Sequence, residues 1–267
     1  MITNFLKTIV QFFLKWFAKI YLWRVKPHII VIAGTTGRHW IKEAVADALK
    51  EKNFPVRANK KNFNAEIGLP LSILGLPSGE GNFWQWLKIL WQGLNICVNP
   101  RSNLRKSAYI VLEMAIDRPD NMNYLLSIVK PQTIILTTIT MIYTENFENL
   151  DEIALEYKKL IKALPWDGLA ILNFDDERVK KLAEFCGRVI SYGFSEEADF
   201  QVKNVRKVLD GQEIEISVNQ RSNQRRSASI IKINRFGNHH IYAVLVKEII
   251  KEHFKISTLD FFKSLSH

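Results

Sequence analysis

Apolar and polar residues form two kinds of pattern along this chain: one predicts strands and the other predicts helices. Short apolar runs rich in β-branched residues are typical of buried parallel strands, and they cover residues 28–33, 108–116, 133–139, 168–173 and 189–192. Apolar residues that recur every three or four positions indicate helices over 39–52, 83–94, 121–129, 149–164 and 177–185. Strands that alternate with helices predict an α/β fold with a doubly wound, mostly parallel sheet.

The pattern changes after about residue 198, where polar and apolar side chains alternate in short segments. Such alternation is typical of half-buried antiparallel strands, here expected over 199–208, 212–218 and 228–235. The dipeptide Asp210-Gly211 is a turn signal between the first two of them. We therefore expect a small antiparallel β-hairpin subdomain at about 198–236.

Two further stretches complete this outline. Helical patterns over 238–254 and 257–265 predict two closing C-terminal helices, with Ser257 as the N-cap of the second. Residues 53–82 are rich in Asn, Pro and Gly and are expected to be irregular. We divide the chain into an N-terminal helix, residues 1–26, and one large α/β domain, residues 27–267.

The N-terminal segment is apolar, aromatic and basic. At 100° per residue, its apolar side chains cover one broad face and Lys7, Lys15 and Lys19 fall on the other. The lysines interrupt a transmembrane run, and no small-residue cleavage site of a signal peptide follows. Two interpretations remain open for residues 2–24: a helix lying on a membrane surface, or a helix packed on the domain that follows. The expected location is the cytoplasm, with a peripheral position at the inner face of the membrane under the first interpretation.

Charge adds a preference for anionic partners. The chain of 267 residues has a formal net charge of +10 and a pI near 9.5, which suits nucleotides, phosphosugar ligands or an acidic membrane surface. Two Arg-rich loops, within 98–111 and 218–231, permit nucleic-acid binding. We do not expect a nucleic-acid partner, because no recognised binding motif accompanies them.

The strongest chemical signal is the turn after the first predicted strand. Gly34, Thr35, Thr36 and Gly37 stand between that strand and a helix. A glycine turn that opens a helix exposes backbone N–H groups and a helix N-terminus, which together hold a phosphate. We therefore expect these four residues to bind a nucleotide or another phosphate-bearing ligand.

Several segments, in this order, resemble the central ATP-binding domain of the Mur ligases of cell-wall peptidoglycan synthesis. The resemblance is strongest to the branch that adds D-alanyl-D-alanine to a UDP-muramoyl tripeptide. It rests on residues 34–37 with Lys42-Glu43, and on residues 62–70, 111–114, 117–119, 172–176 and 237–243. It implies ATP and Mg²⁺ as cofactors and a UDP-muramoyl peptide as ligand.

The resemblance also implies roles for single residues. Glu113 matches a magnesium-binding glutamate at a strand end, Asn173 and Asp176 match a nucleotide-proximal element, and His239 matches a catalytic-site histidine. Each has a structural alternative: a surface carboxylate for Glu113, turn and N-cap residues for Asn173 and Asp176, and a helix-start histidine for His239.

The phosphate loop departs from the pattern that this chemistry needs. Arg38 stands at the position of the phosphate-binding lysine, and a planar guanidinium does not reproduce a compact ammonium. His39 stands where a hydroxyl would bind Mg²⁺, and the bulky Trp40 follows it. Further departures from the family pattern occur at Thr138, Tyr143, Tyr157, which aligns with a lysine used in carbamylated form, and His240.

These departures favour a catalytically inactive Mur-ligase-like protein with a degenerate phosphate loop, acting as a binding or scaffolding module. The N-terminal UDP-binding domain and the C-terminal domain of full ligases are expected to be absent. The alternative is an active ATP-dependent ligase with a divergent site, or one completed by a partner chain. A basic nucleic-acid-binding module is the third hypothesis.

Overall fold

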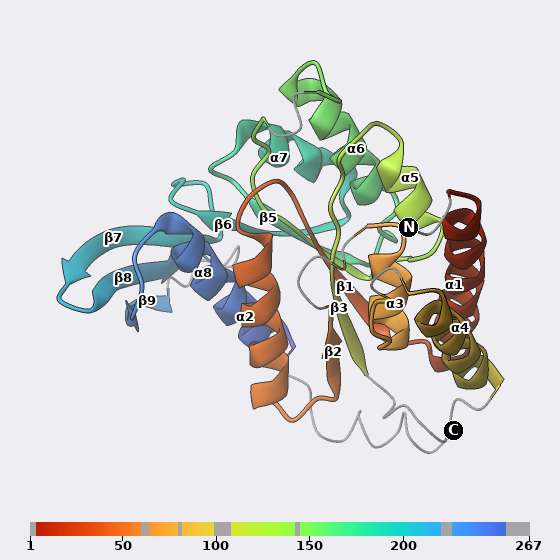
Figure 1. The fold of residues 1–267 in the computed structure, drawn as a ribbon. Helices are drawn as coiled ribbons and strands as arrows, with labels where there is room; N and C mark the ends of the chain where they lie inside the picture. The colour runs from red at the N-terminus through yellow and green to blue at the C-terminus, as the bar shows by residue number, and fades with distance from the viewer. Residues whose placement is uncertain are drawn as a thin grey trace.

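A single nine-stranded sheet organises the chain (Figure 1). The computed structural model describes residues 4–59, 63, 65–79, 82–98, 108–141, 145–219 and 226–254. The strand order is β2-β3-β1-β4-β5-β6-β7-β8-β9. The strands are β1 (His28–Ala33), β2 (Val56–Ala58), β3 (Tyr109–Glu113), β4 (Thr133–Leu136), β5 (Leu169–Asn173), β6 (Arg188–Gly193), β7 (Phe200–Val208), β8 (Gly211–Val218) and β9 (Arg226–Ile233).

The parallel part of the sheet confirms the predicted α/β fold. Strands β2 to β6 and β1 pair in parallel, and β1 lies between β3 and β4. The chain therefore reverses its winding direction beside β1, and the loops that follow β1, β3 and β4 meet at one edge of the sheet. Such a switch point at the carboxyl edge is where ligands bind in open α/β sheets.

Helices cover both faces of the sheet (Figure 1). One face packs against α2 (Arg38–Glu51) and α8 (Asn238–His253), whose apolar side chains form a core with β1, β5 and β8. The other face packs against α1 (Asn4–Val25), α3 (Gly68–Leu74), α4 (Phe83–Val98), α5 (Asn121–Leu126), α6 (Leu150–Lys162) and α7 (Glu177–Lys181), which continues into the 3-10 turn η1 (Leu182–Phe185). The central strands are therefore buried on both sides, as their continuous apolar runs predict.

The antiparallel segment continues this same sheet. Strand β7 pairs in parallel with β6 through Tyr192 and Phe200, and then pairs antiparallel with β8, which pairs antiparallel with β9. One face of these strands contributes Val202, Ile214 and Ile216 to the core beneath α8. The predicted closing helix over 238–254 is α8, whereas the helix predicted over 257–265 lies outside the described residues.

The expectation that residues 53–82 are irregular was wrong. Strand β2 and helix α3 both lie within them. Strand β2 has only three residues at the edge of the sheet, which is too short for a periodic signal. Helix α3 is buried along its whole length, so its sequence is apolar on every side and lacks the period of an amphipathic helix.

The N-terminal helix packs on the domain. Val10, Leu14, Ala18 and Tyr21 are buried against α3 and α4. The opposite side of the helix is also apolar and exposed, so the division into one apolar and one lysine face was incomplete. Within the described part of the chain, no helix is both long enough and apolar enough to cross a membrane.

Candidate functional site

The predicted phosphate loop lies at the switch point and is held there by the segment that follows β4. The Thr35 N–H and hydroxyl both donate to the Thr138 carbonyl, each at 2.8 Å. The hydroxyls of Thr36 and Thr138 are 2.6 Å apart, and the Thr140 N–H donates to the Thr35 hydroxyl at 2.8 Å. The hydroxyls of Thr35 and Thr36 therefore form hydrogen bonds with the segment that follows β4, 102 to 105 residues away in the chain.

Gly34 and Gly37 give the loop its shape. Gly34 has φ +115°, and a Cβ there would lie 2.1 Å from the hydroxyl oxygen of Thr137. Gly37 has φ +76° and precedes the first residue of α2. No side chain caps the N-terminus of α2, so the N–H groups of its first turn are not satisfied by a capping side chain. This arrangement leaves a place for an anion at the helix N-terminus.

Arg38 turns back onto the loop instead of extending away from it. Its Nε donates to Glu113 Oε1 at 3.2 Å, and its Nη1 donates to the carbonyl of Gly34. Both side chains of the ion pair are largely buried. Arg38 is the first residue of α2 and Glu113 ends β3, so the parallel order of β1 and β3 brings the two together. The guanidinium thereby neutralises the carboxylate that the resemblance assigns to magnesium.

Tyr157 approaches the same loop from the other side of the sheet. This side chain of α6 is fully buried, and its hydroxyl donates to the Gly34 carbonyl at 2.8 Å. The Gly34 carbonyl therefore accepts hydrogen bonds from Arg38 and Tyr157, two residues for which the resemblance implies lysine positions. Both positions stabilise the loop itself in this chain.

A cavity of about 400 Å³ opens beside the loop. Its walls come from the loop, the start of α2, the segment after β4 and the start of α8. Trp40 lines it, with the Arg235 guanidinium 4.6 Å from its ring centroid and His240 at 4.6 Å on an edge-to-face geometry. Burial, the neighbouring His239 and Arg235 lower the pKa of His240, so this wall favours the neutral imidazole. Aromatic rings beside an anion-binding turn suit a nucleotide or another flat phosphate ester.

His239 belongs to this cavity. It lies in the first turn of α8, and its Cβ would be 3.8 Å from a Cβ added at Gly37. Its ring is 4.1 Å from that of His240 and 6.0 Å from that of Trp40. The structure thus brings together Gly34, Thr35, Thr36, Gly37, Arg38, Glu113 and His239.

Asn173 and Asp176 lie farther along the edge, after β5, and their side chains bond to backbone. Asn173 accepts from the N–H of Asp175 at 3.0 Å. Asp176 caps α7 by accepting from Arg178 and Val179, and its second oxygen accepts from the Ile139 N–H at 2.7 Å. This geometry matches the turn and N-cap alternative. Tyr143 and part of the segment 62–70 lie outside the described residues.

Sequence patterns gave no role of their own to three residues, Asp175, Tyr242 and Lys42, although each lies in a segment on which the resemblance rests. Asp175 accepts hydrogen bonds from the backbone of Phe194 and Ser195 and from the hydroxyl of Tyr242 at 2.8 Å, which joins three elements. Burial and this bond to Asp175 raise the pKa of Tyr242, which also lines the cavity beside the loop. Lys42 was noted only as part of a motif, yet it is fully buried and donates to the Asn59 carbonyl at 2.8 Å.

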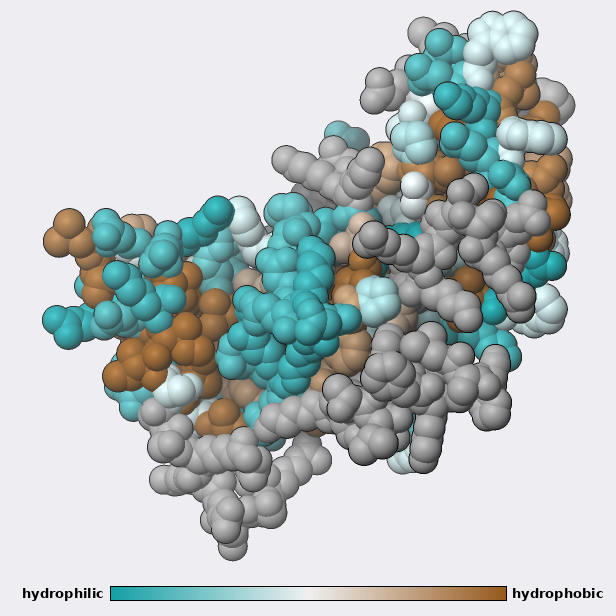
Figure 2. Space-filling view, turned by 90° about the horizontal axis from the view of Figure 1, so that it is seen from below, coloured by the Kyte–Doolittle hydropathy of each residue, from teal (hydrophilic) through white to brown (hydrophobic). Residues whose placement is uncertain are grey.

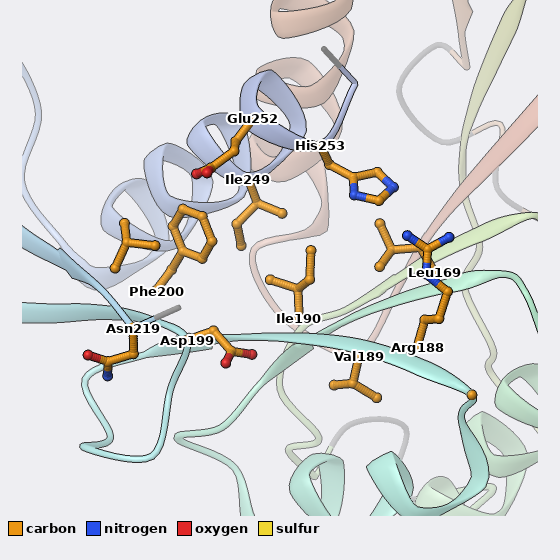
Figure 3. Close-up of a pocket in the computed structure, with 12 residues that line it drawn as sticks. Leu169, Arg188, Val189, Ile190, Asp199, Phe200, Asn219, Ile249, Glu252 and His253 are labelled. Atoms are coloured by element: carbon orange, nitrogen blue, oxygen red, sulfur yellow. The ribbon is translucent and has the colours of Figure 1, made fainter. Parts of the chain in front are cut away.

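A second cavity, of about 500 Å³, lies between α8 and strands β5 to β8 (Figure 3). It includes Leu169 and Arg188, the first residues of β5 and β6, so it reaches the opposite edge of the parallel strands. Its lining includes Arg188 and the carboxylates of Glu252 and Asp199, together with His253, whose pKa is lowered by burial and by Arg188 (Figure 3). Asp199 is already bonded to Ser191 at 2.9 Å. This cavity contains none of the predicted site residues.

Comparison with known proteins identifies the family. The model of the Mur ligase middle domain matches residues 98–247, which is more than half of the chain. The chain belongs to the Mur ligase family. It is 21% identical over 192 residues to the UDP-N-acetylmuramoyl-tripeptide–D-alanyl-D-alanine ligase of Haemophilus influenzae, and 23% identical over 194 residues to that of Bacillus subtilis. These alignments cover 70% and 73% of this chain and 36% of each relative.

Solved Mur ligases share the fold. The MurF ligase of Thermotoga maritima in complex with ADP matches with a TM-score of 0.72 and 20% identity, over 91% of this chain and 49% of that chain. MurF of Acinetobacter baumannii matches with a TM-score of 0.68 and 17% identity, over 92% and 48%. The chain therefore spans about a third of the curated relatives it matches and about half of these solved chains.

The residues at the switch point do not fit the magnesium site that the resemblance implies. Glu113 has Arg38 as its counter-ion, and His39 offers no hydroxyl at the next position. Across the described residues, no group of three or more His, Cys, Asp or Glu side chains is placed to hold a metal ion. A loop with uncapped N–H groups and an internal guanidinium instead suits an anion bound without a metal.

Proposed function

We propose that this protein is a catalytically inactive Mur-ligase-like module that binds a phosphate-bearing ligand. The ligand class is a nucleotide or a UDP-muramoyl peptide, and the role is that of a binding or scaffolding module in peptidoglycan precursor synthesis. A cytoplasmic location belongs to the same proposal. The MurF structure with ADP, at 20% identity, supports the choice of ligand class, since its fold covers 91% of this chain.

The pairing of Arg38 with Glu113 carries the proposal. Phosphoryl transfer needs a positively charged side chain that is free to contact the transferred phosphate, and a metal ion that bridges the phosphate oxygens. Here the guanidinium donates to a carboxylate and to the Gly34 carbonyl. One preorganised charge commonly contributes on the order of a hundredfold or more to a rate. A site whose cation is paired with Glu113 and whose residues do not fit the metal is therefore expected to bind without turnover.

Phosphate release by the purified full chain tests this proposal. The assay contains ATP, Mg²⁺, a UDP-muramoyl tripeptide and D-alanyl-D-alanine, and the expected rate equals the rate without protein. Binding of ADP is measured separately by calorimetric titration with Mg²⁺ and with a chelator, and equal affinities are expected. Release of phosphate that depends on both the protein and Mg²⁺ would refute the proposal.

An active ligase with a divergent site, completed by a partner chain, is the second candidate. The cavity of about 400 Å³ beside the loop favours it, since Trp40, His239 and the start of α2 form walls suited to a nucleotide. Phosphate release by the unchanged protein distinguishes the candidates, because an active ligase releases phosphate above background and an inactive one does not. In an active ligase Glu113→Ala should then abolish that release, and unchanged release by the variant would contradict a role for Glu113.

A further inference from the structure

One side of helix α4 is apolar and faces away from the domain. Trp84, Leu87, Trp91, Leu94 and Val98 are all exposed, and they recur at intervals of three and four residues. That spacing places them on one side of a helix. The opposite side is the one that packs on the core, through Trp86, Ile89, Gly93, Ile96 and Cys97. Helix α4 thus carries more apolar side chains than its packing against the domain buries.

Helix α1 repeats this arrangement next to α4. Its buried side faces α3 and α4, while its other side exposes Phe12, Phe13, Trp16, Ile20 and Trp23. These five residues fall within an arc of about 100° at the helical angle per residue. Four of the five are aromatic, and large aromatic rings are favoured at the boundary between water and lipid.

The two helices are packed together and form one outward surface. The Cys97 thiol donates to the Phe17 carbonyl at 3.4 Å, Arg24 donates to the Cys97 carbonyl, and Gly93 lies directly against the Phe17 ring. We call the exposed apolar residues of α1 and α4 the α1–α4 surface. With Phe83, the first residue of α4, it holds eleven of the nineteen large apolar side chains that are exposed among the described residues, which marks it as an interaction surface. In Figure 2 hydrophobic and pale residues mix with hydrophilic ones at the right of the molecule, the side on which α1 and α4 lie in Figure 1.

The charge on these helices is of one sign. Neither α1 nor α4 contains Asp or Glu, and the first acidic residue of the chain is Glu43. The two helices carry five basic residues: Lys7, Lys15, Lys19, Arg24 and Lys88. All 27 carboxylates of the chain lie outside the two helices, so no acidic residue of α1 or α4 offsets this positive charge.

We propose that the α1–α4 surface docks the protein onto an anionic lipid bilayer, with both helices lying in the plane of the interface. Aromatic and aliphatic side chains enter the boundary between headgroups and acyl chains, and the flanking lysines pair with lipid phosphates. Neither helix crosses the bilayer, in keeping with the absence of a spanning helix from the described residues. The pocket beside the phosphate loop is formed by α2 and α8 on the other face of the sheet, so a docked molecule keeps it accessible.

Charge favours the bilayer over a second copy of the chain as the occupant. A symmetric dimer through this surface would place the same patch against itself. Two copies of a surface without carboxylates would then bring like charges together, which opposes association. An anionic bilayer supplies the opposite charge over the whole surface, and each basic residue near it adds to the attraction.

Vesicle sedimentation of the full chain tests the proposal. Sedimentation is expected with phosphatidylcholine vesicles that contain about 30% phosphatidylglycerol, and much less with phosphatidylcholine alone, because the basic residues act on anionic lipid. The double substitution Trp84→Ser/Trp91→Ser is expected to weaken partitioning about tenfold or more, since each indole buries a large apolar area. Trp166→Ser is the matched control, because Trp166 is 80% exposed, as Trp84 (76%) and Trp91 (70%) are, but lies outside the surface.

A charge reversal separates docking from nonspecific adhesion. Lys88→Glu on α4 is expected to weaken binding to the anionic vesicles about fivefold or more, whereas Lys50→Glu on α2 leaves it unchanged. All variants are first checked for the thermal transition of the unchanged protein, and exposed positions are chosen so that folding is retained. The proposal fails if the anionic vesicles do not sediment the protein, or if the control substitutions weaken binding as much. It also fails if the surface instead forms a dimer that Trp84→Ser/Trp91→Ser dissociates.

Discussion

Replacing Arg38 by Met removes the counter-ion of a largely buried carboxylate while keeping most of the side-chain length. The atoms Arg38 Nε and Glu113 Oε1 are 3.2 Å apart. Two unit charges at that separation attract by about 5 kcal/mol when the effective dielectric constant is about 20. Removing both charges from water offsets much of this attraction, so the net contribution is smaller.

The expected effects follow from what each substitution leaves behind. Arg38→Met leaves Glu113 without its partner and is expected to lower the free energy of unfolding by about 3 kcal/mol. Glu113→Gln keeps an acceptor for the guanidinium and should cost about 1–2 kcal/mol. The double variant should lose about 2 kcal/mol less than the sum of the two single losses, since the pair can be broken only once.

Urea-induced unfolding, followed by circular dichroism, measures all four proteins of this cycle. Losses that add to within about 0.5 kcal/mol would mean that the two side chains are not coupled, and would refute the role assigned to Arg38. A second measurement uses Mg²⁺. A metal bound at Glu113 would raise the unfolding midpoint, because a ligand that binds only the folded state stabilises it. No rise is expected for the unchanged protein.

Four further predictions concern the loop, the core and the charge. Gly34→Ala should cost more than about 3 kcal/mol of stability, whereas Gly37→Ala, whose added Cβ makes only an ordinary contact with His239 at 3.8 Å, should cost about 1–2 kcal/mol, and equal losses would contradict the geometry. Tyr157→Phe should cost about 1 kcal/mol in urea unfolding, for its hydrogen bond to the loop. Burial, and then the charge of His253, lower the pKa of His28 from 6.5 to about 4. The stability from neutral His28 should therefore be complete above about pH 6.5 and fall by up to about 3 kcal/mol toward pH 4, a slope that His28→Gln should remove. Filter binding should show no salt-dependent affinity for random DNA or RNA.

The fold was largely predictable because its signals are local and strong. Five buried strands gave continuous apolar runs, and the parallel α/β class followed from their alternation with helices. Strand β2 and helix α3 were missed, because a three-residue edge strand and a fully buried short helix carry no period. The position of the phosphate loop was also predictable, since the glycine turn between a strand and a helix has its own residue pattern.

The chemistry of the site depended on contacts between distant residues. The resemblance implies a lysine position for Arg38, yet not that its guanidinium would meet Glu113, 75 residues away. It implies a lysine position for Tyr157 as well, and only the structure shows that this hydroxyl reaches Gly34, 123 residues away. Asp175 was part of the segment 172–176, but its acceptor role could not be predicted, because it depends on Phe194, Ser195 and Tyr242 arriving from two other elements.

The sequence by itself determined the order of strands and helices, the glycine loop and the membership of the Mur ligase family, because these depend on local backbone preference and on residues close in the chain. The tertiary structure alone decided which charges are paired and which apolar faces are covered. The pattern of residues 83–94 predicted a helix, but only packing revealed that Trp84 and Trp91 point to solvent while Trp86 enters the core. Periodicity says which side chains share a face of a helix, and the neighbours brought by the sheet decide which face is buried.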